Sequence, residues 1–258
     1  MMSLTRALLC AALLVSSFSP IERAQAQRRG QQPAFMPNVP YDGRLTFVRV
    51  KYQMPEFGGG GFRGGRDLPW SHDYPRGERH FTKIVSELSS TRVRIDASNI
   101  LTLDDPQLGK YPIAYMAEAG FWRPSDAEAM GLRNYLAKGG FIIFDDFAGE
   151  HWMNFESQMK KVLPNLRPIE LDLSHPIFDS FYRIKTLEYD HPMYRGAKSV
   201  FYGVFEENDP TKRMLAIVNY NNDLSEYWEF SDTGMFPLDM SNEAYKLGVN
   251  YIIYALTR

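Results

Sequence analysis

The chain has 258 residues, of which 44% are hydrophobic, and this composition is sufficient for a substantial buried core. The formal net charge is −2 at pH 7, whereas proteins that bind nucleic acid usually carry clustered positive charge, so we expect no nucleic-acid partner. The composition also excludes a disordered acidic chain, because charged residues make up only 23%.

The first 26 residues have the pattern of a secretory signal peptide. Arg6 precedes an apolar run at 7–18, and Ala24-Gln25-Ala26 supplies the small-residue pattern at which such peptides are cleaved. The run is shorter than the about 20 residues of a membrane-spanning helix. We therefore expect an exported protein, periplasmic or secreted, with no transmembrane segment after cleavage. Its mature form would contain no cysteine, because Cys10 is removed with the signal peptide.

Residues 27–43 are polar and contain prolines, which predicts a flexible tether before a single domain at 44–258. The first predicted strand, 45–52, is rich in β-branched and aromatic residues. A glycine-rich loop is expected after it, at about 54–77. Gly59, Gly61 and Gly64 have the spacing of a dinucleotide-binding turn, but no helix begins within the motif, so we expect a surface loop.

Strand and helix patterns then alternate along the chain. Ser125 and Glu128 have the spacing of a capping box, which predicts the start of a helix that ends at Gly139-Gly140. This alternation predicts an α/β sandwich with five or six mostly parallel strands and helices on both faces. Residues 176–212 are less regular and predict an insertion or an antiparallel edge. The remaining predicted strands are 91–96, 111–116, 141–144, 169–171 and 214–218. Three further helices are predicted: one begins near 78, one begins near 152, and the last covers 241–256.

Candidate catalytic residues follow the predicted strands, because ligands of open α/β sheets bind beyond the carboxyl ends of the strands. Glu118 follows one strand, and Asp145 and Asp146 follow the next. Such carboxylates could hold a cation or act as a general base. The alternative is that one caps a helix and the other pairs with an arginine. His175, after a later strand, could be a base or ligand, or a turn histidine bonded to backbone.

Candidate ligand-binding residues lie on a loop and after a strand. Trp70, Asp73 and Tyr74 combine aromatic and titratable groups on one loop, although this loop could equally be packing against itself. His151 lies one turn after the Asp145-Asp146 pair. No residue is assigned as a metal ligand, because the zinc-protease pattern H-E-x-x-H is absent, and the cofactor is left unknown. A serine esterase is not supported either, because the sequence has no G-x-S-x-G motif.

Several segments together resemble a known family across most of residues 45–258. They include LTFVRVKY at 45–52, LRNYLAKGGFIIFDDFAGEHW at 132–152, LSHPIFDSFY at 173–182 and YKLGVNYIIYALTR at 245–258. In this order they are similar to the bacterial family catalogued as domain of unknown function 4159. The resemblance implies a flavodoxin-like fold, similar to class I glutamine amidotransferases and trehalose-utilisation proteins. It also implies partners in the cell envelope, from systems with von Willebrand A domains or AAA ATPases.

The resemblance does not bring a mechanism with it. Amidotransferases use a cysteine nucleophile, which the mature chain lacks, so glutamine hydrolysis by a thioester is excluded and enzyme activity is left open. We expect a non-catalytic envelope binding or assembly module. The alternative is a carboxylate- or metal-dependent hydrolase of a sugar or envelope polymer, which would use Glu118, Asp145, Asp146 and His175. Separations above about 10 Å would disfavour this alternative, because proton transfer requires hydrogen-bond reach.

Overall fold

The computed structural model describes residues 35–53, 68–189, 192–194 and 196–258. The chain divides into two units, Met1–Gln32 and Pro33–Arg258, and the described residues all belong to the second. The predicted signal peptide, the tether up to residue 34, and residues 54–67 of the predicted glycine-rich loop lie outside the described residues. Among the helices of the described part, none is both long and apolar enough to cross a membrane.

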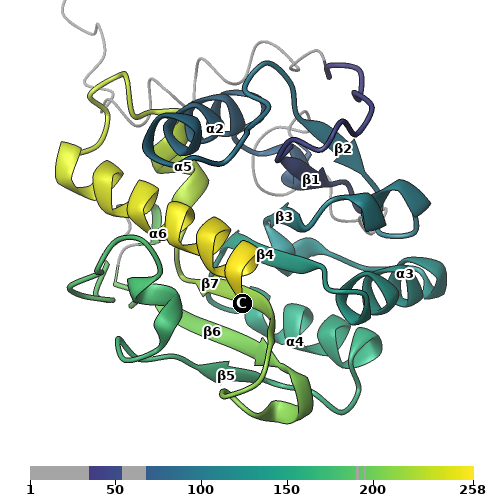
Figure 1. The fold of residues 1–258 in the computed structure, drawn as a ribbon. Helices are drawn as coiled ribbons and strands as arrows, with labels where there is room; N and C mark the ends of the chain where they lie inside the picture. Colours follow the sequence, from purple (N-terminus) through teal and green to yellow (C-terminus); the bar gives the residue numbers. More distant parts are fainter. Residues whose placement is uncertain (1–34, 54–67, 190–191, 195) are drawn as a thin grey trace, which may run out of the picture. The chain divides into compact units, whose positions relative to one another are not determined.

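A seven-stranded sheet with the order β2-β1-β3-β4-β7-β6-β5 forms the centre of the second unit (Figure 1). Strands β2, β1, β3, β4 and β7 are parallel, whereas β6 is antiparallel to both of its neighbours. The predicted α/β class with a mostly parallel sheet is therefore confirmed, and the arrangement is consistent with a flavodoxin-like sandwich. The strands are β1 (Val48–Val50), β2 (Asn99–Leu101), β3 (Ile113–Ala117), β4 (Phe141–Phe147), β5 (Pro168–Glu170), β6 (Val200–Phe205) and β7 (Met214–Tyr220).

Helices cover both faces of the sheet. Figure 1 shows α2, α5 and α6 on one face and α3 and α4 on the other. The predicted capping box is confirmed, because the Ser125 hydroxyl accepts from the Glu128 amide at 3.1 Å and Glu128 Oε2 accepts from the Ser125 amide at 2.8 Å. The α-helices of the described residues are α2 (Arg76–Leu88), α3 (Asp126–Ala137), α4 (His151–Val162), α5 (Leu224–Glu229) and α6 (Leu238–Thr257).

Three elements differ from the sequence-based expectation. Residues 91–96 form only an isolated bridge, between Val93 and Leu45, and the edge strand is β2 further along the chain. Arg94 forms ion pairs with Asp42 and Asp96 instead, so this stretch contributes charged contacts at the edge of the sheet. The irregular region at 176–212 contains β6, which is antiparallel, as one of its two interpretations predicted, but β6 lies between β7 and β5 and is not the edge strand. It brings the total to seven strands. Helix α5 was missed because six residues are too few to show a helical period.

The two faces of the central strands differ in chemistry. The face that packs on α3 and α4 is apolar and includes Val48, Val50, Met116, Phe144 and Val218. The opposite face carries buried polar side chains near the carboxyl ends of four strands, namely Arg49, Tyr115, Asp145 and Asn219. Their partners on α2, α5 and α6 include Glu78, Leu224 and Tyr251. This polar row leads to the carboxyl edge of the sheet.

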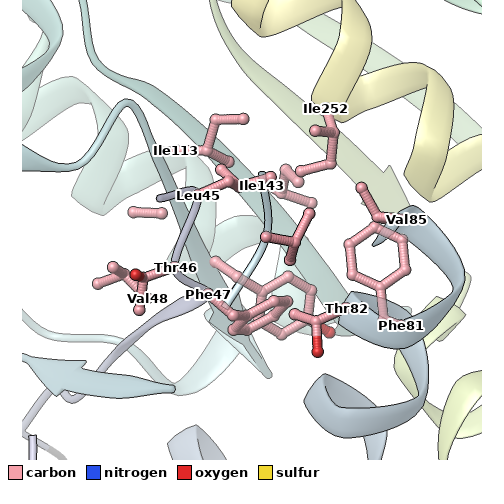
Figure 2. Close-up of a pocket in the computed structure, with 13 residues that line it drawn as sticks. Leu45, Thr46, Phe47, Val48, Phe81, Thr82, Val85, Ile113, Ile143 and Ile252 are labelled. Carbon is pink, nitrogen blue, oxygen red and sulfur yellow. The ribbon is translucent and has the colours of Figure 1, made fainter. Parts of the chain in front are cut away.

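Towards the amino ends of the strands, the same face becomes apolar. A cavity of about 20 Å³ lies there. Figure 2 shows side chains that line it, among them Phe47, Phe81, Val85 and Ile252. A space of this size has room for about one water molecule, and its apolar walls offer a water few hydrogen bonds. This cavity is therefore too small for an organic ligand.

Candidate functional site

The carboxyl edge of the sheet contains a topological switch point. Strands β2 and β3 pair with opposite sides of β1, so the chain reverses its direction of winding between β1 and β3. Ligands of open α/β sheets bind at such a crevice. Glu118 follows β3 directly, and the short helix η1 (Pro69–Ser71) delivers His72 and Asp73 to the same edge. Asp146, at the end of β4, and Asp223, just after β7, complete the group.

His72 lies at the centre of this group. Its Nδ1 atom is 2.7 Å from Asp146 Oδ2, 3.4 Å from Glu118 Oε1 and 4.0 Å from Asp73 Oδ1. Four buried residues, His72, Asp73, Asp146 and Asp223, each offer a ligand atom, and these atoms all lie within 4.8 Å of one another. We call these four residues the His72 cluster. Their mutual distances are short enough for one cation to contact all four.

The backbone is strained at three residues of the site. Asp73 has a φ of 64°, Glu118 of 44° and Asp146 of 59°, all in the left-handed region that costs a non-glycine residue about 1–3 kcal/mol. The irregular register of β4 falls between Phe144 and Phe147. This irregularity explains why two successive aspartates can both be buried on the polar side of the sheet, where strict alternation would send them to opposite faces. Strain of this kind concentrates at functional sites.

Asp145 is held behind the cluster by protein donors. Its Oδ2 atom lies 2.9 Å from the Tyr115 hydroxyl, and the carboxyl accepts hydrogen bonds from Asn219 at 3.0 Å and from the Leu224 amide at 3.0 Å. Burial and the neighbouring charge of Asp146 raise the pKa of Asp145 to about 7, although these hydrogen bonds act in the opposite direction. Because both of its oxygens already have donors, Asp145 is poorly placed to bind a cation.

A chain of short oxygen contacts joins Asp145 to the cluster. The Tyr115 hydroxyl lies 2.9 Å from Asp145 Oδ2 and 2.6 Å from Ser225 Oγ, and Ser225 Oγ lies 2.5 Å from Asp73 Oδ2. Two hydroxyl protons cannot fill three contacts, so one carboxyl group must carry a proton for all three to be hydrogen bonds. The raised pKa of Asp145 makes that carboxyl the natural carrier.

The electrostatics of the cluster reflect crowded carboxylates around one imidazole. Burial alone would lower the pKa of His72, but Asp73, Asp146 and Glu118 outweigh it and raise the pKa to about 10. Burial, followed by the charges of Asp146 and Asp73, raises the pKa of Asp223 well above its usual value. The site therefore holds protons tightly, and a divalent cation could take the place of one or more of these protons.

Two neighbouring features extend the site. Asp73, Glu226 and Glu229 form a second group of ligand atoms within 4.8 Å, so Asp73 is common to both groups. Tyr194, in the short helix η5 (Pro192–Tyr194), donates a hydrogen bond of 2.5 Å to Asp146 Oδ1. The irregular region before β6 thus contributes directly to the carboxyl edge of the sheet.

One known protein family matches nearly all of the sheet and helices described above. Residues 46–256 match one family, and this span includes every strand of the sheet and the entire His72 cluster. The chain belongs to the family described as Domain of unknown function (DUF4159). No curated protein matches the chain. The family description assigns no activity.

The structure brings together several of the residues singled out from the sequence. Glu118, Asp146 and Asp73 lie around His72, and Asp145 lies directly behind them. His151 is half-buried at the side of the site, with its ring 4.4 Å from that of Phe121. Burial lowers the pKa of His151 even though Asp146 and Glu150 act to raise it.

Trp70 and Tyr74 pack within the fold instead. The Trp70 ring is buried and stacks on Phe35 at 5.0 Å, while its carbonyl accepts from Arg49 at 3.1 Å. The Tyr74 hydroxyl accepts from the Met36 amide at 2.9 Å. For these two side chains the packing interpretation of the loop therefore fits the structure better than ligand contact. Asp73, between them in sequence, contacts Ser225 Oγ and belongs to the His72 cluster instead.

His175 lies far from the cluster. Its ring contacts Tyr254, which also contacts Phe141, the first residue of β4. Asp146 is five residues further along that strand, a distance of roughly 16 Å at 3.3 Å per residue. His175 accepts from the Ile177 amide at 3.3 Å, as the alternative interpretation of a turn histidine expects. It is therefore not part of the candidate site.

Sequence reasoning missed His72, Asp223, Tyr194, Tyr115 and Ser225. Asp223 had a usable signal, because it follows the predicted strand at 214–218 and obeys the same strand-end rule that identified Glu118. His72 lies between the candidate residues Trp70 and Asp73. Because histidine is a common base and metal ligand, its residue type alone could have made it a candidate. Tyr194 and Ser225 had no local signal, because their roles depend on contacts with residues 48 and 152 positions away, respectively.

Proposed function

We propose that this domain is a metal-dependent hydrolase whose His72 cluster binds a divalent transition-metal cation. The proposal rests on one observation, the convergence of four buried ligand atoms within 4.8 Å of one another at the switch point of the sheet. One imidazole with several carboxylates suits Mn²⁺ or Zn²⁺ better than Ca²⁺, which prefers an all-oxygen shell. For the substrate we propose a sugar or polymer of the bacterial envelope, in line with the predicted export of the chain.

A divalent cation in the cluster would lower the pKa of a bound water to about 7 and polarise a carbonyl or similar group of the substrate. Glu118 is suited to act as the general base. Its carboxylate is 3.4 Å from His72 Nδ1, yet 19% of its side chain is exposed, more than for any member of the cluster. It can therefore reach both the site and an incoming substrate. Tyr194, which donates to Asp146, can orient that ligand.

Thermal unfolding of the full chain with Mn²⁺, Zn²⁺, Mg²⁺ or Ca²⁺ tests cation binding. A cation at 100 times its dissociation constant stabilises the folded state by about 2.7 kcal/mol. For a domain of this size we expect Mn²⁺ or Zn²⁺ to raise the midpoint by about 5–11 °C. Asp146→Asn and Asp223→Asn should each abolish most of this rise, because each removes one charged ligand.

Asp104→Asn is the matched control, because Asp104 is exposed and outside the cluster. It should keep the full rise of the midpoint. Hydrolysis is then measured as soluble product released from purified envelope polysaccharide, with Mn²⁺ and with a chelator. If none of the four cations raises the midpoint of the parent chain, or if Asp146→Asn responds like the parent, the proposed metal site is wrong.

The second candidate function is a non-catalytic binding or assembly module of the envelope. Half-buried aromatic side chains around His151 and Trp152 favour it, because such rings suit protein and sugar surfaces. They are Phe121, Trp152, Tyr202 and Tyr220. In this case the fold would be related to the glutamine amidotransferases without their chemistry, and the partners would be envelope proteins with von Willebrand A domains or AAA ATPases. Cation binding without any product release would favour this candidate.

A further inference from the structure

We propose that Ser225 is a positioning residue that holds Asp73 in its cation-binding orientation, and that Tyr115 and Asp145 fix the Ser225 hydroxyl in turn. This inference rests on the proposed metal site and assigns a function to the buried chain behind it. It also gives Asp145 a different role from the catalytic or ligand role considered from the sequence.

Ser225 lies between two members of the cluster. Its Oγ atom donates to Asp73 Oδ2 at 2.5 Å and is 3.3 Å from Asp223 Oδ1. The other oxygen of Asp73, Oδ1, faces His72 Nδ1 at 4.0 Å. The serine hydroxyl therefore occupies one oxygen of Asp73 and turns the other towards the remaining ligands. Ser225 is only 1% exposed, so its hydroxyl cannot act on a substrate itself.

The orientation of Ser225 is itself determined by the polar row of the sheet. Tyr115, on β3, contacts Ser225 Oγ at 2.6 Å and Asp145 Oδ2 at 2.9 Å. Asp145 also accepts from the Leu224 and Ser225 amides at 3.0 and 3.3 Å, which anchors the first turn of α5 to β4. Ser225 is thus held through its side chain by β3 and through its backbone by β4.

Asp223 also fixes the beginning of α5. Its side chain caps α5, with Oδ1 accepting from the Glu226 amide at 2.9 Å. Asp145 and Asp223 therefore determine where α5 begins, and the beginning of α5 determines where the Ser225 hydroxyl meets Asp73. Hydrogen bonds of this kind to a metal-binding carboxylate typically change the affinity for the metal 10–100-fold.

The test is a double-mutant cycle on the affinity of the full chain for Mn²⁺, measured by isothermal titration calorimetry. Ser225→Ala should weaken binding about 10–100-fold. If Ser225 acts through Asp73, then in an Asp73→Asn background the same substitution should cause almost no further loss. A general structural role would instead give losses that multiply. Ser231→Ala is the matched control, because its hydroxyl bonds to Trp228 and Tyr245 outside the cluster.

Tyr115→Phe provides a second variant if Ser225→Ala folds poorly, because it removes only the hydroxyl that orients Ser225. It should weaken Mn²⁺ binding in the parent and leave the Asp73→Asn variant unchanged. Normal binding by Ser225→Ala or Tyr115→Phe, or losses that multiply in the cycle, would overturn the inference while leaving the metal site intact. A parent chain that binds no Mn²⁺ would remove the proposed function, and this inference with it.

Discussion

The two faces of the central strands solve the same packing problem in different ways. Towards α3 and α4, side chains such as Phe144 and Val218 fill the space by apolar contact alone. Towards α2, α5 and α6, the same strands bury Arg49, Tyr115, Asp145 and Asn219, each with hydrogen-bonded partners. Burying polar groups costs stability unless they are hydrogen-bonded. We therefore expect this face to tolerate substitutions less well than the apolar face, because each polar side chain needs its partner. The same hydrogen bonds give the site at the carboxyl edge a defined geometry.

The largest expected loss of stability follows the removal of one partner of the buried ion pair on the polar face. Arg49 Nε lies 2.5 Å from Glu78 Oε1, and both side chains are almost fully buried. We expect Arg49→Met to cost about 3–5 kcal/mol, because Glu78 would be left buried without its ion-pair partner. Arg49→Met combined with Glu78→Leu should recover much of this loss. Urea unfolding measures both, and equal losses in the single and double variants would contradict the prediction.

The pH dependence of stability is the next largest expected effect. The pKa of Asp145 is about 7 in the folded chain, raised from 3.8. The folded chain thus holds this proton more tightly, so the stabilisation is full below pH 3.8 and is lost as the pH rises through 7. We expect this carboxyl to lower the free energy of unfolding by on the order of 2–3 kcal/mol between pH 5 and pH 8 in a metal-free chain.

Asp145→Asn should remove that part of the pH dependence, as urea unfolding at the two pH values would show. His72 acts in the same direction over a higher range, because its pKa is raised from 6.5 to about 10 and its contribution is lost as the pH rises through 10. The parent chain should therefore still become less stable above pH 8. An unchanged slope in Asp145→Asn would show that its carboxyl is ionised throughout.

The apolar face should give the smallest and most local effect. Ile142 is fully buried on the side of α3 and α4. Ile142→Val should cost about 0.5–1.5 kcal/mol, because it removes one buried methyl group. The affinity for Mn²⁺ should stay within about twofold of the parent, because the substitution shares no partner with the cluster. Calorimetry that found a larger change would show that the two faces are energetically coupled.

Much of the architecture could be predicted from local patterns. The capping box at Ser125 was visible because its residues lie three apart, and the β4 strand because its apolar run has no alternation. The strand-end rule then identified Glu118, Asp145 and Asp146 without knowledge of any contact. It could not separate Asp145 from Asp146, because only the irregular backbone of β4 turns one into the cluster and leaves the other behind it.

The sequence by itself determined the α/β class, the polar strand ends and the absence of a cysteine nucleophile after residue 10, because each depends on residue type or short-range spacing. Only the tertiary structure decided that His72, Asp73, Asp146 and Asp223 meet. It also placed His175 towards the amino ends of the strands. Contacts of this kind join residues up to 151 positions apart, as His72 and Asp223 are. Their geometry is determined by strand order and register, which no local pattern of side chains encodes.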